Sequence, residues 1–131
     1  MTANLFFRIL PHWAAAFGMT LAVEVPLFVL LARYTATKLK VPSCSVRRAA
    51  LAGALGSCIT HPLLWFVWPF AVTDYTAYLI SGELIVAAVE SVTFYLAAKP
   101  ISIKRAAFVA VTANAASFGF GMLVYSILGI T

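Results

Sequence analysis

Four stretches of this chain are continuously apolar over the length that a helix needs to cross a lipid bilayer. They run over residues 11–33, 49–70, 75–98 and 106–130. About 20 apolar residues span the hydrocarbon core, where the backbone must satisfy its own hydrogen bonds as a helix. The stretches lack the alternation of barrel strands. The sequence therefore predicts an all-α polytopic membrane protein, one membrane domain over residues 1–131 with four transmembrane helices.

Composition excludes the common soluble classes. The chain is 63% hydrophobic and only 10% charged, whereas soluble domains carry roughly 45–50% apolar and 25% charged residues. A soluble enzyme, a disordered tail and a disulfide scaffold are all excluded. The two cysteines fall in a predicted loop (Cys44) and inside a span (Cys58), so no disulfide is expected between them.

The basic residues predict an orientation. Eight of the nine lie in or beside the first and third connections: Arg33, Lys38, Lys40, Arg47, Arg48, Lys99, Lys104 and Arg105. Basic residues in short loops stay on the cytoplasmic side, which predicts that both termini are extracytoplasmic. The expected partners are the bilayer and its anionic head groups. Nucleic-acid binding gains no support, because no recognition element accompanies the charge.

The chain resembles a duplicated helical hairpin. Val23–Arg33 aligns with Val89–Lys99, with five of eleven positions identical, and Arg47–Ala50 aligns with Lys104–Ala107. The same register pairs polar residues of the second and fourth spans: Ser57 with Asn114, and Thr60 with Ser117. Hairpins over 11–70 and 75–130 would run the same way through the membrane. We expect a pseudo-two-fold axis along the membrane normal, as in parallel repeats.

Ionisable groups inside the spans are the candidate functional residues: Glu24, His61, Glu83 and Glu90. A charge at mid-bilayer costs about 2.5–3.5 kcal/mol even on the lenient insertion scale. The supporting polar residues are Cys58, Thr60, Asn114 and Ser117. Every span thus contributes a polar group to the middle of the membrane.

These groups admit a functional and a structural interpretation. Cys58 precedes His61 by one turn, and a divalent metal held by His61, Glu24, Glu83 and Glu90 is one hypothesis. In the structural alternative, Glu24 and Glu90 are protonated carboxyls that hydrogen-bond across helices, with Asn114 as partner. His61 would then pair with a carbonyl or with Glu83.

One pattern extends over nearly the whole chain. It comprises Glu24-x-Pro26, the motif from Thr60 to Trp65 (Thr-His-Pro-Leu-Leu-Trp), Glu83 with Glu90, and Asn114-x-x-Ser117. This pattern resembles a family of small bacterial four-span membrane proteins. The resemblance implies the four-span fold and a location in the bacterial inner membrane. It implies no substrate.

Three function classes remain open from the sequence. The first is a mid-membrane site that binds or relays a cation, either a proton or a divalent metal, through the Glu and His cluster. The second is a non-catalytic accessory or scaffold subunit of a larger membrane complex. The third is an intramembrane metal-dependent enzyme, which lacks a recognisable catalytic motif. Because four helices enclose little interior, we also expect a homo-oligomer or a larger membrane-protein partner.

Overall fold

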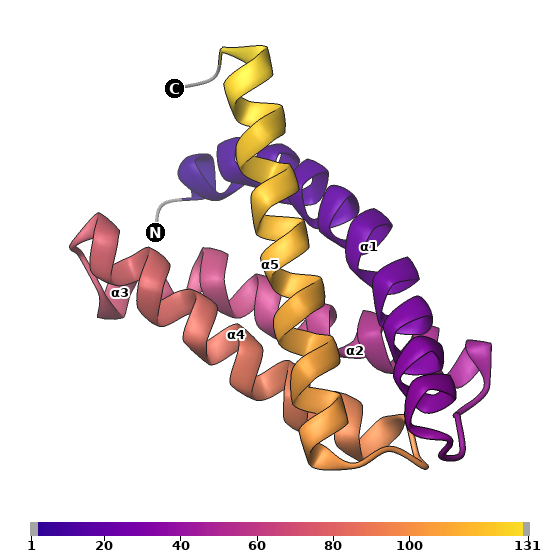
Figure 1. The fold of residues 1–131 in the computed structure, drawn as a ribbon. Coiled ribbons are helices and arrows are strands. Elements are labelled where there is room, and N and C mark those ends of the chain that lie inside the picture. Colours follow the sequence, from indigo (N-terminus) through magenta and orange to yellow (C-terminus); the bar gives the residue numbers. More distant parts are fainter. Residues whose placement is uncertain (1–2, 130–131) are drawn as a thin grey trace.

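The protein is an all-α molecule, as the sequence predicts. A computed structural model describes residues 3–129 as five helices with no strand among them: α1 (Ala3–Leu39), α2 (Val46–Phe66), α3 (Trp68–Ala71), α4 (Tyr75–Ala97) and α5 (Ile103–Leu128). The four long helices are each long and apolar enough to cross a membrane. They correspond to the four predicted spans (Figure 1).

The helices depart most from the predicted boundaries in α1, which begins at Ala3 where residue 11 was expected, and between α2 and α3. α1 continues to Leu39, six residues beyond the expected end at residue 33. Its 37 residues correspond to about 55 Å of helix, more than the bilayer core requires. The second predicted span, 49–70, is divided, because α2 ends at Phe66 and α3 begins at Trp68. Pro69 lies in the first turn of α3, where its missing N–H costs no helical hydrogen bond.

Three helices begin at a side-chain cap. Ser45 Oγ accepts from the Arg48 amide at 3.2 Å, and Ser102 Oγ accepts from the Arg105 amide at 3.3 Å. Asp74 Oδ1 accepts from the Ala77 amide at 2.8 Å. Each cap satisfies an amide that has no partner within its helix. The short connections therefore turn sharply and return the chain as antiparallel hairpins.

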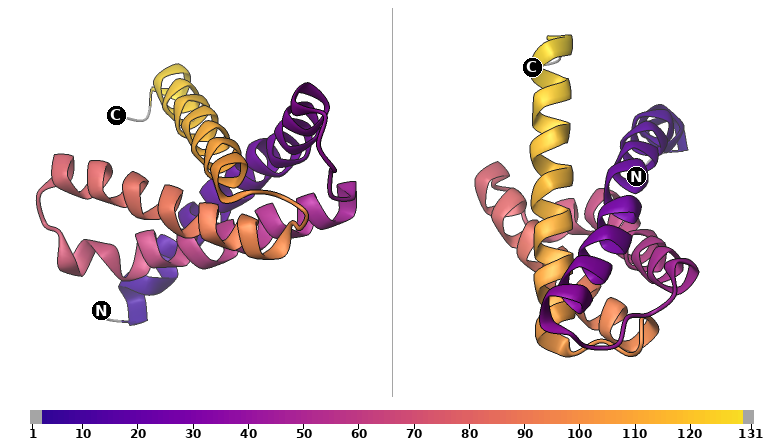
Figure 2. Two further views of the ribbon diagram at one scale, coloured as in Figure 1. Left: turned by 60° about the horizontal axis from the view of Figure 1, so that its bottom comes forward. Right: turned by 45° about the vertical axis from the view of Figure 1, so that its right-hand side comes forward.

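The four long helices form a bundle that is closed at one end and open at the other. α1 packs on α2 and α5, and α4 packs on the same two helices. We call the end that holds the α1–α2 and α4–α5 connections the basic end. Away from it, the C-terminal half of α5 and the N-terminal half of α4 diverge (Figures 1 and 2). We call this second end the open end.

A core of small and aromatic side chains closes the basic end. The rings of Phe28 and Phe94 lie 4.8 Å apart between centroids, and both are fully buried. Buried alanines of α1, α2 and α5 surround them, including Ala32, Ala52 and Ala110. Small side chains let helix backbones approach closely in a membrane, so the bundle is tightest here.

Two arginines join the hairpins at the basic end. Arg105 of α5 donates to the Ala32 carbonyl of α1 at 3.0 Å and to Thr35 Oγ1 at 3.2 Å. Arg48 of α2 donates to the Lys99 carbonyl, after the end of α4, at 2.9 Å. Each arginine thus donates a hydrogen bond to a backbone carbonyl of the other hairpin.

Candidate ion-binding site

Two buried glutamates lie where the closed core meets the open end. Glu24 of α1 is 2% exposed and Glu90 of α4 is 1% exposed. Neither carboxyl forms an ion pair within the described chain. They are close enough to interact electrostatically with each other. Two unpaired carboxylates side by side in a low-dielectric interior are costly, so the arrangement favours a proton on at least one of them.

Glu24 binds a hydroxyl of the neighbouring helix in its own hairpin. Ser57 Oγ of α2 donates to Glu24 Oε2 at 2.8 Å. Ser117 of α5 also interacts with this carboxyl through its side chain. The carboxyl of Glu24 thus meets polar groups from both hairpins.

Glu90 is hydrogen-bonded through both of its oxygens. Thr60 Oγ1 lies 2.7 Å from Oε1, and Asn114 Nδ2 donates to Oε2 at 2.6 Å. The same amide nitrogen of Asn114 donates to the Ala110 carbonyl at 2.9 Å. The expected contact between Asn114 and an intramembrane carboxyl is therefore confirmed.

Each carboxyl can hold or release a proton without losing its hydrogen bond to a hydroxyl. Thr60 Oγ1 lies 3.1 Å from the Gly56 carbonyl, and Ser57 Oγ lies 3.3 Å from the Gly53 carbonyl. A hydroxyl carries one proton and can also accept. It donates to an ionised carboxylate, and it accepts from a protonated carboxyl while donating to the carbonyl. Both protonation states are therefore satisfied.

The polar contacts follow the register of the proposed repeat. Within each hairpin the glutamate meets its aligned partner, Ser57 for Glu24 and Asn114 for Glu90. Between hairpins, Thr60 meets Glu90 and its aligned residue Ser117 meets Glu24. The aligned phenylalanines Phe28 and Phe94 face each other. This correspondence supports the predicted pseudo-two-fold relation.

His61 and Glu83 depart from that register, since the residues aligned with them are Phe118 and Phe17. His61 Nε2 lies 3.4 Å from Thr20 Oγ1, and its Nδ1 is buried with no hydrogen-bond partner. The imidazole lies against Phe17, at 5.1 Å between ring centroids. The expected pairing of His61 with a carbonyl or with Glu83 is wrong, because the imidazole lies among aromatic rings and its one hydrogen bond with the described residues is to Thr20.

Glu83 is half-buried on α4 and forms no hydrogen bond with the described residues. It lies seven residues before Glu90, two turns along the same face of the helix. Glu83 interacts electrostatically with Glu24, Glu90 and Tyr78. Its carboxyl is thus the one intramembrane acid in the described chain without a hydrogen-bonded partner.

Cys58 does not belong to the site. Its side chain is exposed on the outer face of the bundle, and both Cys58 and Cys44 are free thiols. Ser57 and Thr60 lie on the buried face of α2. Cys58 follows Ser57 directly and lies on the exposed face of the same helix. The structure places this expected supporting residue away from the cavity lining that Glu24 and Glu90 share.

The described residues bring no three metal-ligating side chains together. Glu24 and Glu90 have hydroxyl and amide partners in place of a third acidic or imidazole ligand. Divalent metals need several such ligands with defined geometry.

A cavity of about 790 Å³ extends from the glutamates into the open end. Its lining includes Glu24, Thr60, Glu90, Asn114 and Ser117 on one side. The other lining residues are mostly apolar or aromatic, joined by Glu83 and His61: among them are Met19, Leu64, Trp65, Tyr78, Phe118 and Met122. An apolar cavity with a few convergent polar groups is typical of a binding site.

Two hydrogen bonds connect the helices beside this cavity. Tyr78 donates its hydroxyl to the Leu64 carbonyl at 2.9 Å, and Trp68 Nε1 donates to Ser81 Oγ at 3.1 Å. Both link α4 to the end of α2 or to α3. Tyr78 and Thr20 are not among the site residues that the sequence predicts. The spacing of Thr20 and Glu24, four residues apart on one helix face, was an available signal.

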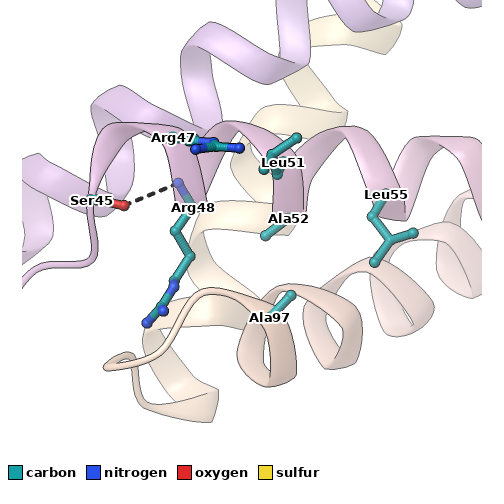
Figure 3. A pocket seen from close by; sticks show the side chains of 7 residues that line it. All are labelled: Ser45, Arg47, Arg48, Leu51, Ala52, Leu55 and Ala97. Atoms are coloured by element: carbon teal, nitrogen blue, oxygen red, sulfur yellow. Dashed lines mark hydrogen bonds between the residues drawn. The ribbon is translucent and has the colours of Figure 1, made fainter.

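A second, smaller pocket of about 380 Å³ lies at the basic end. Figure 3 shows its lining residues: Ser45, Arg47, Arg48, Leu51, Ala52, Leu55 and Ala97. Arg48 extends toward the α4–α5 connection, where it donates to the Lys99 carbonyl. The pocket combines cationic and apolar side chains at the edge of a predicted span.

Comparison with protein-family models, with curated protein sequences and with solved structures finds no match to this chain. The resemblance to a family of four-span bacterial proteins therefore stays a prediction.

Proposed function

We propose that this chain is a small integral membrane protein whose core binds and relays protons through Glu24 and Glu90. The observation that carries the proposal is the pair of carboxyl–hydroxyl–carbonyl chains: Glu24 with Ser57 and the Gly53 carbonyl, and Glu90 with Thr60 and the Gly56 carbonyl. These chains accommodate both protonation states of each carboxyl. Carboxylates at the membrane midplane are the usual signature of proton and ion pathways.

The cavity supplies the route by which protons reach this pair. It extends from the glutamates toward the open end, with Glu83 and His61 in its lining. Toward the basic end, the Phe28–Phe94 core blocks the path. The proposed site is therefore accessible from one side in this conformation. With basic loops on the cytoplasmic side, that side is extracytoplasmic, in a bacterial inner membrane.

Infrared spectroscopy tests the proposal directly, because it separates the carbonyl stretch of a protonated carboxyl from the bands of a carboxylate. The protein would be titrated with pH in lipid nanodiscs. Two titrating carboxyl signals are expected in the wild type, with one lost in Glu24→Gln and one in Glu90→Gln.

The chain offers a matched control. Asp74→Asn also replaces a carboxyl by an amide, but at the exposed start of α4, where asparagine remains a good helix cap. The signals of Glu24 and Glu90 should persist in Asp74→Asn. If both glutamates keep one protonation state across the accessible pH range, the carboxyls are structural and the proposal is wrong.

A second function, an accessory or scaffold subunit, is favoured by the outer half of α5. From Phe118 to Leu128 almost every side chain of the helix is exposed, including Phe120, Met122 and Leu123. Such a surface fits lipid, a second copy or a larger membrane protein. Mild solubilisation of native membranes followed by mass measurement separates these occupants. A defined larger assembly supports the subunit function, and a monomer in every mild detergent opposes it.

A further inference from the structure

The cavity of the open end has walls that suit an organic ligand better than a hydrated ion. Its volume of about 790 Å³ lies in the range of small-molecule sites, roughly 300–1,000 Å³. Apolar and aromatic side chains supply most of the lining, including Trp65, Tyr78 and Phe118. A small metal or alkali ion would make no favourable contact with most of these apolar side chains.

Charge decides which organic ligand fits. The acidic residues of the lining are Glu24, Glu83 and Glu90, whereas no lysine or arginine within the described part of the chain lines the cavity. An anionic amphiphile would place its charge against carboxyls with no compensating cation. A cation would be attracted by the carboxylates and also by the faces of the aromatic rings.

Glu83 is placed to meet such a charge. It lines the cavity and is only half-buried. No hydrogen bond with a described residue occupies its oxygens. Glu24 and Glu90, by contrast, have their own hydrogen-bond donors. The cavity is thus lined by two kinds of carboxyl. Glu83 is available to a ligand, whereas Glu24 and Glu90 are already hydrogen-bonded.

We propose that the open-end cavity binds a hydrophobic organic monocation, such as a substituted ammonium ion, with its charge beside Glu83 and its apolar groups against the aromatic wall. The other titratable groups facing this ligand are Glu24 on α1, His61 on α2, Tyr75, Tyr78 and Glu90 on α4, and Tyr125 on α5.

Binding of the monocation would be coupled to proton release, and this coupling rests on the proposed function. A positive charge in the cavity favours the ionised form of nearby carboxyls. A protonated glutamate plus the monocation then becomes a carboxylate beside the monocation, and one proton leaves to the solution. Charge is balanced because the incoming cation replaces the departing proton.

Tetraphenylphosphonium and tetraphenylborate test this inference. They share size and shape but carry opposite charges, and binding to the purified protein in nanodiscs would be measured by equilibrium dialysis, with empty nanodiscs subtracted. We expect saturable binding of tetraphenylphosphonium alone. Glu83→Gln should weaken it by about tenfold or more, as expected for the loss of a charged partner. Glu83→Asp should restore part of the affinity, and Asp74→Asn should bind as the wild type does.

The outcomes separate this inference from the proposed function. Absence of saturable phosphonium binding, or equal binding of the borate, overturns the inference even where the infrared titration of Glu24 and Glu90 succeeds. Undiminished binding in a folded Glu83→Gln protein overturns the role of Glu83. Phosphonium binding together with no infrared titration of Glu24 and Glu90 overturns the proposed function and the coupling while leaving an organic-cation site. Circular dichroism and gel filtration establish that each variant is folded.

Discussion

The same four helices build two unlike halves. At the basic end they approach closely around Phe28 and Phe94, and at the open end they separate around a cavity. The difference follows from side-chain size. The packed half carries alanine and glycine at the contacts, whereas larger side chains such as Leu64 and Met122 line the open half. In a membrane, small residues decide where backbones meet.

The two halves are expected to have different roles, the packed half in stability and the open half in binding. The packed half holds most of the interhelical contacts of the buried core, together with both arginine bonds between hairpins. The open half holds the cavity and the unpaired Glu83. Glu24 and Glu90 lie at the boundary. Substitutions in the packed half should therefore lower stability, while substitutions in the open half should change binding with little loss of stability.

The largest expected effect is that of Phe94→Ala. Phe94 is fully buried against Phe28, and its removal leaves a cavity among alanines that cannot fill it. We expect a loss of about 3–5 kcal/mol in unfolding free energy, measured by unfolding in mixed micelles. Leu96→Ala is the control, because Leu96 is 64% exposed on the same helix. Equal losses for the two variants would contradict a closed core at the basic end.

Gly53→Ala should cost less, about 1–3 kcal/mol. A Cβ at this position would lie 2.9 Å from Cγ and Cδ2 of the Phe28 ring and 3.1 Å from its Cβ, so the buried phenylalanine itself must move. At Gly119 a Cβ would meet nothing within 4 Å. Gly119→Ala should be neutral or stabilising, because alanine favours helix. The same unfolding assay separates the two, and a stabilising Gly53→Ala would mean that the packed half is looser than described.

Arg105→Ala tests the link between the hairpins. It removes hydrogen bonds to the Ala32 carbonyl and to Thr35 Oγ1. Because the arginine is only half-buried, we expect a loss of about 1 kcal/mol. Lys104→Ala removes an exposed neighbouring charge with no such bond and should have no effect. Faster hydrogen exchange at the end of α1 in Arg105→Ala alone would locate the loss at the basic end.

The sequence predicted the four spans well because each is a continuous apolar stretch, and it predicted the buried glutamates because charge is costly in lipid. Two features could not be predicted, because they depend on how segments far apart in the sequence pack: the partner of His61 and the direction of Cys58. The partner of His61 depends on how α1 curves past α2, and the outward direction of Cys58 depends on which face of α2 meets α4. Neither fact is encoded in local spacing.

The break between α2 and α3 could not be predicted from hydropathy either. Residues 49–70 remain apolar throughout, so the apolar stretch shows no break. Pro69 was the local signal, since a proline inside a helix removes one hydrogen bond. The cavity was not predicted either, because its existence depends on how far the helices diverge and not on the identity of any one residue.

The smallest expected effect on stability distinguishes the boundary from the packed half. In Glu90→Gln, the new amide can donate to Thr60 Oγ1, the hydroxyl can donate to the Gly56 carbonyl, and the remaining oxygen can accept from Asn114. Glutamine thus reproduces the protonated carboxyl, and we expect a change of less than about 1 kcal/mol. Glu90→Ala leaves Thr60 and Asn114 without this partner and should be clearly less stable.

The two Glu90 variants, unfolded side by side, report which protonation state the folded core holds. If Glu90→Gln loses as much as Phe94→Ala, the core requires a carboxylate at this position, and the glutamate belongs to the packed half as a fixed charge. If glutamine is tolerated and alanine is not, the core needs the hydrogen bonds and not the charge. A site that needs no permanent charge can exchange its proton without unfolding the bundle, so tolerance of glutamine together with an infrared titration of Glu90 would separate this boundary site from the packed half.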